Sequence, residues 1–216
     1  MRISQQTMNG IYQFDGLTPV IHADAYVHPT AVLIGDVWVG PRCYVGPNAV
    51  LRGDFGRIVL EQGSNLQDTC VVHAFPGRDT LLENDAHVGH GAVLHGCRIG
   101  RNAMVGMNAV IMDEAVIGEE AIVAALAFVK ANMQVPPRSL VSGIPGTIVR
   151  SLTAQELEWK TKGTAIYQEL ALRSHESLRP AEPLRQAEPG RKRLGSIHGF
   201  DPLFKLKRKT ESARED

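Results

Sequence analysis

Three histidines, His73, His90 and His95, are of a type and spacing that could bind a metal ion together. Neutral imidazole is a common ligand of Zn²⁺, and three imidazoles that leave a fourth position open are typical of catalytic rather than structural zinc. Any one of these histidines alone would be explained more simply as a surface residue. The set is informative because of its place in a six-residue repeat.

The repeat consists of an aliphatic residue at every sixth position, often with a small residue four positions later. Its first run is Ile21, Val27, Leu33, Val39, Val45 and Leu51, and its second is Ile99, Val105, Ile111, Ile117, Val123, Val129, Val135 and Val141. A fixed period of this kind determines the whole fold. A period of six fits neither an α-helix nor a simple alternating strand.

The repeat predicts an all-β solenoid, a parallel β-helix of triangular section with three hexads per coil. The aliphatic residue fills the interior, and the small residue lets the chain turn beside it. Cys43 and Cys70 occupy that small inward position, so we expect them to be packing residues. Bulky residues resist the backbone conformations of tight corners. The residues expected to supply those conformations are Gly40, Gly46, Asn48, Gly106 and Asn108.

The repeat is interrupted twice. Three extra residues lie around Phe55–Arg57, and a loop with four extra residues lies around Ala74–Thr80. Loops that interrupt a rigid solenoid are frequent places for function.

Counting through both insertions puts three residue pairs at the same place on successive coils: Leu51–Arg52, Val72–His73 and Leu94–His95. His73 and His95 are therefore expected side by side. A backbone spacing of about 4.8 Å allows two imidazoles to reach one ion at about 2.1 Å.

His90 belongs to a different face of the prism, stacked on Asp68. It cannot readily reach an ion held by His73 and His95 of its own chain, but a neighbouring prism in a threefold trimer could bring its own His90 there. We therefore predict a homotrimer with a metal site at each subunit interface. His22, His28 and His87 show no such convergence and are expected to be surface residues.

Composition limits the other possibilities. The chain of 216 residues carries 23 basic and 23 acidic residues, so neither nucleic acid nor an anionic membrane is an expected partner. It has no apolar run long enough to span a membrane, and its first ten residues do not resemble a secretory signal. A cytoplasmic location is expected.

Four segments follow from these patterns. They are an N-terminal extension (1–11), the β-helix (12–150), a C-terminal helix (151–179) and a basic, proline-containing tail (180–216). Thr153 and Glu156 have the spacing of a capping box, which predicts a helix over about 154–176. The tail is expected to form an extended arm whose final segment is poorly ordered.

At this point the chain resembles a known family, the γ-class carbonic anhydrases, which are left-handed β-helix trimers. The resemblance covers roughly residues 12–175. Besides the repeat, it rests on Arg52-Gly-Asp54, Asn65-Leu-Gln67-Asp68, His73 and the run His90-Gly-Ala-Val-Leu-His95.

The resemblance implies a role for each of these residues. His73, His90 and His95 match the metal ligands, with Zn²⁺, Fe²⁺ or Co²⁺ as the ion. Gln67 matches a residue that hydrogen-bonds the metal-bound water, with Asn65 nearby, and Tyr167 matches a tyrosine near the active site. Three further residues match structural positions. Arg52 and Asp68 match an intersubunit salt bridge, and Asp54 matches a residue behind the metal site.

Two departures from the efficient anhydrases are informative. Phe55 stands where those enzymes carry a glutamate, and the short loop from Ala74 to Asp79 holds no glutamate that could shuttle protons. Fast hydration of CO₂ requires proton export, so strong anhydrase activity is not expected. Phe55 and Phe75 would instead give a more apolar entrance, suited to an organic acyl group.

The C-terminal segments Trp159–Gly163 and Glu182–Arg193 resemble one branch of this family, which contains phenylacetate-degradation and carnitine-operon proteins. The leading hypothesis is a trimeric, metal-dependent acyl-CoA thioesterase. It would act on hydroxylated aryl-CoA in phenylacetic acid degradation through a metal-bound hydroxide. The alternatives are a weak γ-type carbonic anhydrase acting on CO₂ or bicarbonate, a hexapeptide acyltransferase and a non-catalytic trimeric scaffold. Arg191–Arg193 could contact a CoA phosphate or belong to a solvated arm.

Overall fold

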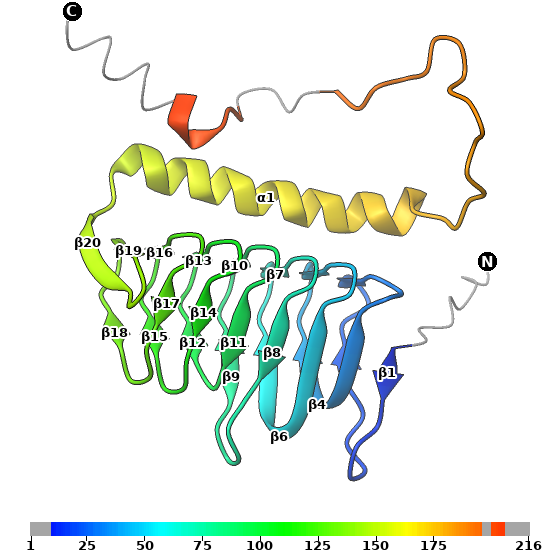
Figure 1. The fold of residues 1–216 in the computed structure, drawn as a ribbon. Coiled ribbons are helices and arrows are strands. Elements are labelled where there is room, and N and C mark those ends of the chain that lie inside the picture. Colours follow the sequence, from blue (N-terminus) through cyan, green and yellow to red (C-terminus); the bar gives the residue numbers. More distant parts are fainter. Residues whose placement is uncertain (1–9, 196–199, 206–216) are drawn as a thin grey trace, which may run out of the picture.

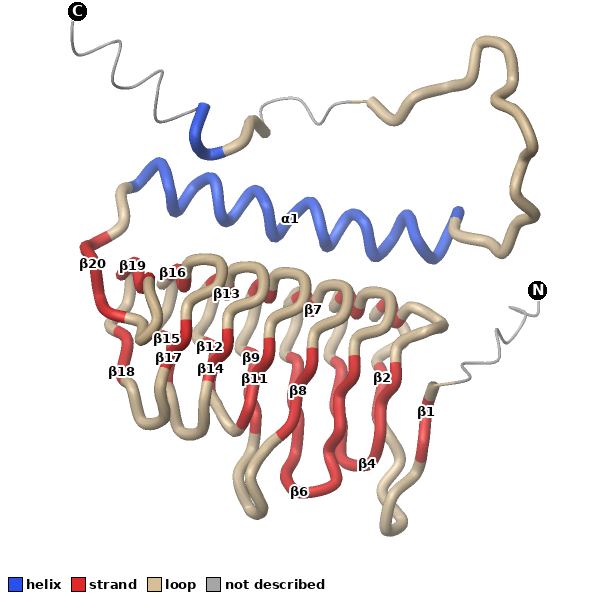
Figure 2. Tube along the Cα trace, in the orientation of Figure 1, coloured by secondary structure: helices blue, strands red, loops and turns tan. Residues whose placement is uncertain are grey.

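The computed structural model describes residues 10–195 and 200–205. These residues form a left-handed parallel β-helix of about seven coils, followed by one long helix that lies along it and by a tail that turns back over that helix (Figure 1). Short strands alternate with turns around the whole prism (Figure 2). The predicted fold class is confirmed.

Three faces make up the prism. The first face contains β1 (Ile11–Tyr12), the first half of β4 (Val32–Val39), the first half of β6 (Val50–Leu60), β8 (Val71–His73), β11 (Val93–His95), β14 (Val110–Ile111) and β17 (Phe128–Val129). The second face contains β2 (Val20–Ile21), the second halves of β4 and β6, β9 (Thr80–Leu82), β12 (Arg98–Ile99), β15 (Val116–Ile117) and β18 (Gln134–Val135).

The third face is a sheet of its own. It contains β3 (Tyr26–Val27), β5 (Tyr44–Val45), β7 (Asn65–Leu66), β10 (His87–Val88), β13 (Met104–Val105), β16 (Ile122–Val123) and β19 (Ser139–Ser142). These strands pair in parallel, and β20 (Thr147–Ser151) closes the prism by pairing antiparallel to β19.

The interior is filled as the repeat predicts. Leu33, Leu51 and Leu60 are almost completely buried, and so are the small residues Cys43 and Cys70, both free thiols. Burial of one aliphatic side chain per hexad supplies the main stabilisation of the solenoid, at about 1.5–3 kcal/mol for each.

The predicted reason for the corner glycines is only partly right. Asn48 and Asn108 do have a positive φ, of 57° and 54°. Gly46 and Gly106 do not, and are needed for another reason: a Cβ on Gly46 would lie 2.7 Å from the backbone nitrogen of Asp68, and one on Gly106 would overlap Ala125. The coils approach too closely there for any side chain. The positive φ recurs every six residues, at Asn102, Asn108, Glu114, Glu120, Leu126, Asn132 and Arg138.

The two interruptions take different forms. The extra residues around Phe55–Arg57 are absorbed into β6, one continuous strand of 11 residues. β4 pairs with β6 on both sides of this insertion, with a register shift after Gly35. The residues between β8 and β9 instead form an irregular loop. Both features lie at the edge of the prism opposite the long helix (Figure 1).

Helix α1 (Ala154–Ser177) begins at the predicted capping box, in which Thr153 and Glu156 exchange hydrogen bonds between side chain and backbone. The buried carboxylate of Glu156 also accepts two hydrogen bonds from Arg150, at 2.7 and 2.8 Å. This bidentate pair fixes the chain where it leaves β20. The helix then lies against the third face, in contact with β3, β5 and β7.

Candidate functional site

His73 and His95 are brought together by strand register. They are directly paired residues at the ends of β8 and β11. The Nδ1 atom of His73 lies 3.2 Å from the Nε2 atom of His95, and the ring centroids are 5.2 Å apart. The stacking of these two histidines predicted from the sequence is confirmed.

Each of these two histidines uses its other ring nitrogen to contact a carboxylate. The Nε2 atom of His73 lies 2.9 Å from Asp54, and the Nδ1 atom of His95 lies 2.7 Å from Asp113. Burial would raise the pKa of Asp54, but hydrogen bonds from Arg52 and His73 outweigh it and hold that pKa below its usual value. Both imidazoles are thereby oriented by an anion, with the remaining nitrogens facing each other.

Asp113 was not predicted from the sequence. Its position in the repeat could have indicated its role: it follows Ile111 by two residues, and Ile111 pairs with Leu94 one coil earlier. That register puts Asp113 on the coil directly beyond His95.

His90 lies elsewhere, in the turn between β10 and β11. Its Nδ1 atom is 2.6 Å from Asp68, as expected from the predicted stacking of these two residues. His90 therefore shares the pattern of His73 and His95, with one ring nitrogen on a carboxylate. Within residues 10–195 and 200–205 of the single chain, no group of three or more ligand side chains gathers at one point.

The predicted salt bridge between Arg52 and Asp68 is a contact between two subunits and stays a prediction. Within one chain, Arg52 donates a hydrogen bond to Asp54 at 2.7 Å, and Asp68 contacts His90. Phe55 lies against the ring of His73, with centroids 5.2 Å apart, and is half exposed. This part of the predicted apolar entrance is therefore adjacent to the histidine pair.

Gln67 and Asn65 belong to a buried polar cluster on the third face. The side-chain amide of Gln67 donates to Asn65 Oδ1 at 3.1 Å and lies 2.8 Å from the Nε2 atom of His87. The Nδ1 atom of His87 in turn lies 3.2 Å from the amide nitrogen of Asn65. All three side chains are buried. The cluster fixes how the amide of Gln67 is directed.

The prediction that His87 is a surface residue was wrong. Its accessible fraction is 9%, because α1 covers it. Burial lowers its pKa to about 3, with smaller contributions from the charges of Lys160 and His90, so the ring is neutral. The missed signal was register: His87 pairs directly with Asn65 one coil earlier.

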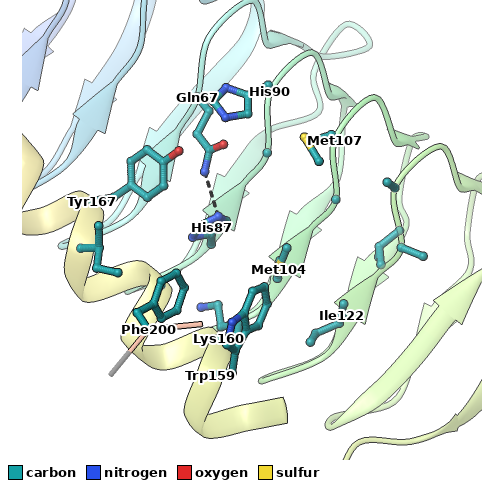
Figure 3. Close-up of a pocket in the computed structure, with 17 residues that line it drawn as sticks. Gln67, His87, His90, Met104, Met107, Ile122, Trp159, Lys160, Tyr167 and Phe200 are labelled. Carbon is teal, nitrogen blue, oxygen red and sulfur yellow. Dashed lines mark hydrogen bonds between the residues drawn. The ribbon is translucent and has the colours of Figure 1, made fainter. Parts of the chain in front are cut away.

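Tyr167 on α1 completes this cluster. Its ring meets His87 edge to face, with centroids 5.3 Å apart. Burial and the negative charge of Asp68 raise its pKa to about 12, so the phenol remains protonated at neutral pH. Tyr167, which the resemblance matched to a tyrosine near the active site, lies beside Gln67, as Figure 3 shows.

A cavity of about 320 Å³ opens next to these residues, between the third face and α1 (Figure 3). Gln67, His90 and Tyr167 line one end. Apolar side chains from the solenoid, the helix and the tail line the rest of the cavity. These side chains are Met104, Met107, Ile122, Trp159, Ile166 and Phe200.

Lys160 also lines this cavity and is almost completely buried. Its ammonium group donates hydrogen bonds to the backbone oxygen of Asp85 at 2.9 Å and to Asn102 Oδ1 at 2.6 Å. Burial lowers its pKa to about 7, although the negative charges of Asp85 and Glu120 oppose that shift. A buried lysine at this position was not predicted from the sequence.

The tail is extended and exposed over residues 179–195. Arg191, one of the residues expected to contact a CoA phosphate, pairs with Glu188 at 3.0 Å. The expectation that the final segment of the tail is poorly ordered concerns residues 206–216, which lie outside the described part of the chain. In residues 10–195 and 200–205, no helix has the length and apolar character needed to cross a membrane.

This solenoid defines a class, the hexapeptide-repeat proteins, whose β-helices commonly assemble as trimers. The family model described as "Bacterial transferase hexapeptide (six repeats)" matches residues 18–53 and 96–131. The three candidate ligands lie between these two segments. The family model alone therefore does not cover the candidate ligands.

The carnitine operon protein CaiE of Salmonella newport is 56% identical to this chain over 167 residues, which are 77% of the chain and 84% of that relative. The CaiE of Salmonella dublin is 57% identical over the same length. The chain therefore belongs to the family of CaiE, within the hexapeptide-repeat proteins.

Two solved structures share the fold of this chain. A Bacillus cereus protein assigned provisionally as an acetyltransferase is 32% identical, with a TM-score of 0.76, and the match covers 77% of this chain and 96% of that one. A hexapeptide transferase family protein from Anaplasma phagocytophilum is also 32% identical, with a TM-score of 0.73 and coverage of 76% and 96%.

Proposed function

We propose that the protein is a homotrimeric, metal-dependent hydrolase of acyl-CoA thioesters. Each metal site would be formed by His73 and His95 of one subunit and His90 of its neighbour. One observation carries the proposal: all three imidazoles have one ring nitrogen on an aspartate. Metal-bound histidines characteristically contact a carboxylate or carbonyl in this way, because it fixes the ring and increases its basicity.

The spacing of the histidine pair fits one shared ion. Two ligands at about 2.1 Å from a tetrahedral ion lie about 3.4 Å apart. The facing nitrogens of His73 and His95 are separated by 3.2 Å. Small side-chain adjustments would suffice for binding Zn²⁺, Fe²⁺ or Co²⁺. A third imidazole from another subunit would leave one position open for a reactant.

The ion would supply a hydroxide nucleophile near neutral pH, which suits attack on a carbonyl carbon. The residues of the chain position the reactants. Gln67 offers its amide at the end of the cavity that also holds His90, and the neutral ring of His87 holds that amide in place. Tyr167, which remains protonated, can donate a hydrogen bond to an oxygen in the cavity.

A thioester is favoured over CO₂ by the surroundings of the site. The cavity beside Gln67 is mainly apolar, and Phe55 lies against the ring of His73, one of the proposed ligands. Asp79, the acidic residue of the short loop, accepts a hydrogen bond from the backbone of Arg57 at 3.0 Å. That hydrogen bond reduces its usefulness as a proton carrier, which fast CO₂ hydration would need. We propose hydroxylated aryl-CoA, as in phenylacetate degradation, as the substrate.

Acyl transfer is the second candidate, because the family model and the related structures carry transferase names. Such an enzyme would use a histidine base and need no metal ion. The curated relatives are named for a carnitine operon, so an acyl-CoA with a trimethylammonium group belongs in the substrate test.

The test uses purified full-length protein. We expect a metal content near one per subunit, and hydrolysis of hydroxyphenylacetyl-CoA that is lost with a chelator and restored by Zn²⁺, Fe²⁺ or Co²⁺. His90→Ala should abolish this activity, whereas His22→Ala, an exposed histidine, should not affect it. Full turnover by the metal-free protein would contradict the proposal. Acyl transfer to an added amine after chelation would favour the transferase, and metal without turnover of any substrate would favour a scaffold.

A further inference from the structure

The cavity under α1 has a strong polarity gradient. At one end are the amide of Gln67, the imidazole of His90 and the ring of Tyr167. At the other end are the side chains of Ile122 and Trp159, with methionines between them (Figure 3). A ligand that enters the cavity must therefore place its polar atoms near His90 and its apolar part under the helix. An acyl group with its carbonyl at the candidate metal site has this distribution.

The apolar end is lined by aromatic rings. Phe200 stacks on Trp159, with centroids 5.6 Å apart and an angle of 10° between the planes. The indole of Trp159 also donates a hydrogen bond to the backbone oxygen of Asp201 at 3.0 Å. The tail residue Phe200 is thus held as part of the cavity wall, far in sequence from the solenoid that forms the opposite wall. Aromatic walls favour a flat aromatic or similarly apolar group.

The charges around the cavity disfavour a cationic acyl group. Aromatic rings can attract a quaternary ammonium group, and a neighbouring carboxylate would strengthen that attraction through its charge. None of the described residues that line the cavity is an aspartate or glutamate, and the carboxylate of Asp68 lies behind His90 at the polar end. Lys160, whose pKa is lowered to about 7 by burial, instead brings partial positive charge to the wall. A neutral group is therefore preferred over a cation of similar size.

We infer that this cavity is the acyl pocket of the enzyme and binds a compact, uncharged aromatic acyl group, with Phe200 of the C-terminal tail as its end wall. The inference rests on the proposed function for the position of the carbonyl. The volume of the cavity, about 320 Å³, is at the lower end of the range for ligand pockets. A pocket of this size fits one ring on a short linker better than a long acyl chain.

Binding can be tested without catalysis. The chain has two tryptophans, so Trp38→Phe leaves Trp159 as the sole tryptophan, whose emission can be excited selectively over that of the tyrosines. Phenylacetamide, which has the aryl group and a carbonyl but is not a thioester, should change the Trp159 emission saturably, with or without chelator. Ala125→Phe should fill the cavity from its exposed wall and weaken binding at least about tenfold, because the ring would occupy the ligand's volume.

Ala165→Phe is the matched control, since Ala165 is exposed on α1 and does not line this cavity. It should bind phenylacetamide like the parent. Equal binding by the two phenylalanine variants, or no binding by the parent, would overturn the inference. So would tighter binding of 4-trimethylammoniobutanamide than of phenylacetamide. Binding of phenylacetamide by a protein that hydrolyses no thioester would contradict the proposed function alone.

Phe200→Ala gives a second readout in the active enzyme. Removing the end wall should lower the ratio of kcat/KM for phenylacetyl-CoA to that for acetyl-CoA by at least about fivefold, because only the larger acyl group reaches that wall. An unchanged ratio would show that the acyl group does not contact Phe200, and would contradict the inference.

Discussion

The two halves of the candidate site are built in different ways. The half with His73 and His95 lies on the first face, where strand register alone pairs the two rings. The half with His90, Gln67 and His87 combines a turn, a sheet and a helix that is distant in sequence. The first half presents two candidate ligands on a rigid surface, whereas the second supplies one candidate ligand together with the cavity. Neither half has a complete site, which is why assembly is central to the proposal.

The difference also concerns exposure. The side chain of His73 is 13% exposed and that of His90 is 46% exposed. Exposed residues of a solenoid face are available to a neighbouring subunit, whereas His87 is covered by its own helix. We therefore expect mutations in the first half to affect metal binding, and mutations in the second half to affect positioning and folding as well.

The largest effect is expected from the carboxylate behind the histidine pair. Asp113→Asn keeps the shape of the side chain but removes the charge that orients His95. We expect metal affinity to fall by about 10–100-fold, as is usual when such a partner is removed. Titration of the apoprotein with Zn²⁺ against a competing chelator measures this.

Asp24→Asn is the matched control, because Asp24 is exposed and pairs with His22, away from the candidate ligands. If Asp113→Asn and Asp24→Asn bound Zn²⁺ equally well, the role assigned to Asp113 would be wrong. Asp68→Asn should weaken binding too, which would show that the carboxylates of the two halves act alike.

A smaller effect is expected from His87, and it depends on pH. Its pKa is about 3 in the folded chain and about 6.5 in an unfolded one, so the unfolded chain takes up the proton first as the pH falls. The contribution of neutral His87 to the free energy of unfolding is fully present above about pH 6.5 and is lost as the pH falls towards 3. Between pH 7 and pH 5 the loss from this residue is about 2 kcal/mol.

Urea unfolding at these two pH values measures the loss. His87→Gln has no titrating ring, so its stability should change less with pH than that of the parent. The comparison concerns the pH dependence and not the absolute stability, which the substitution also alters. An identical pH dependence in parent and variant would mean that His87 is not held neutral, whereas His22→Gln should behave like the parent.

The smallest effect is expected from the predicted salt bridge between subunits. Arg52→Ala should weaken the trimer by about 1 kcal/mol per interface, because partly exposed ion pairs contribute little. Sedimentation at decreasing protein concentration would detect it. Arg57→Ala is the control, since Arg57 pairs with Asp36 and the ring of Trp38 within the chain. Equal dissociation of both variants would argue against the Arg52–Asp68 contact.

The placement of the candidate ligands in both halves could be predicted from the sequence, because the six-residue period converts position directly into stacking. The pairing of His73 with His95 and the stacking of His90 on Asp68 both follow from counting. The same count would have placed His87 on Asn65, but His87 was interpreted as a surface residue because it did not converge with the other histidines. Its burial depends on α1, whose position the repeat does not encode.

The cavity was less accessible to prediction. Trp159 and Phe200 are 41 positions apart and share no periodic pattern, so nothing in the sequence indicated that they stack. The burial of Lys160 similarly depends on how α1 lies against the third face. Gly46 and Gly106 were expected to allow unusual backbone angles, yet close packing of coils explains them, and only three-dimensional contacts reveal that.

The most direct test of the shared site is to mix two inactive variants. His90→Ala keeps the histidine pair, and His73→Ala keeps His90, so a mixed trimer would contain some intact sites. After unfolding and refolding together in equal amounts, the mixture should recover about one quarter of the parent activity, because an intact interface needs one particular variant on each side. A mixture of His73→Ala with His95→Ala should recover none, since both ligands must come from one chain. Failure of the first mixture to recover activity, in trimers shown to be mixed, would contradict the shared site.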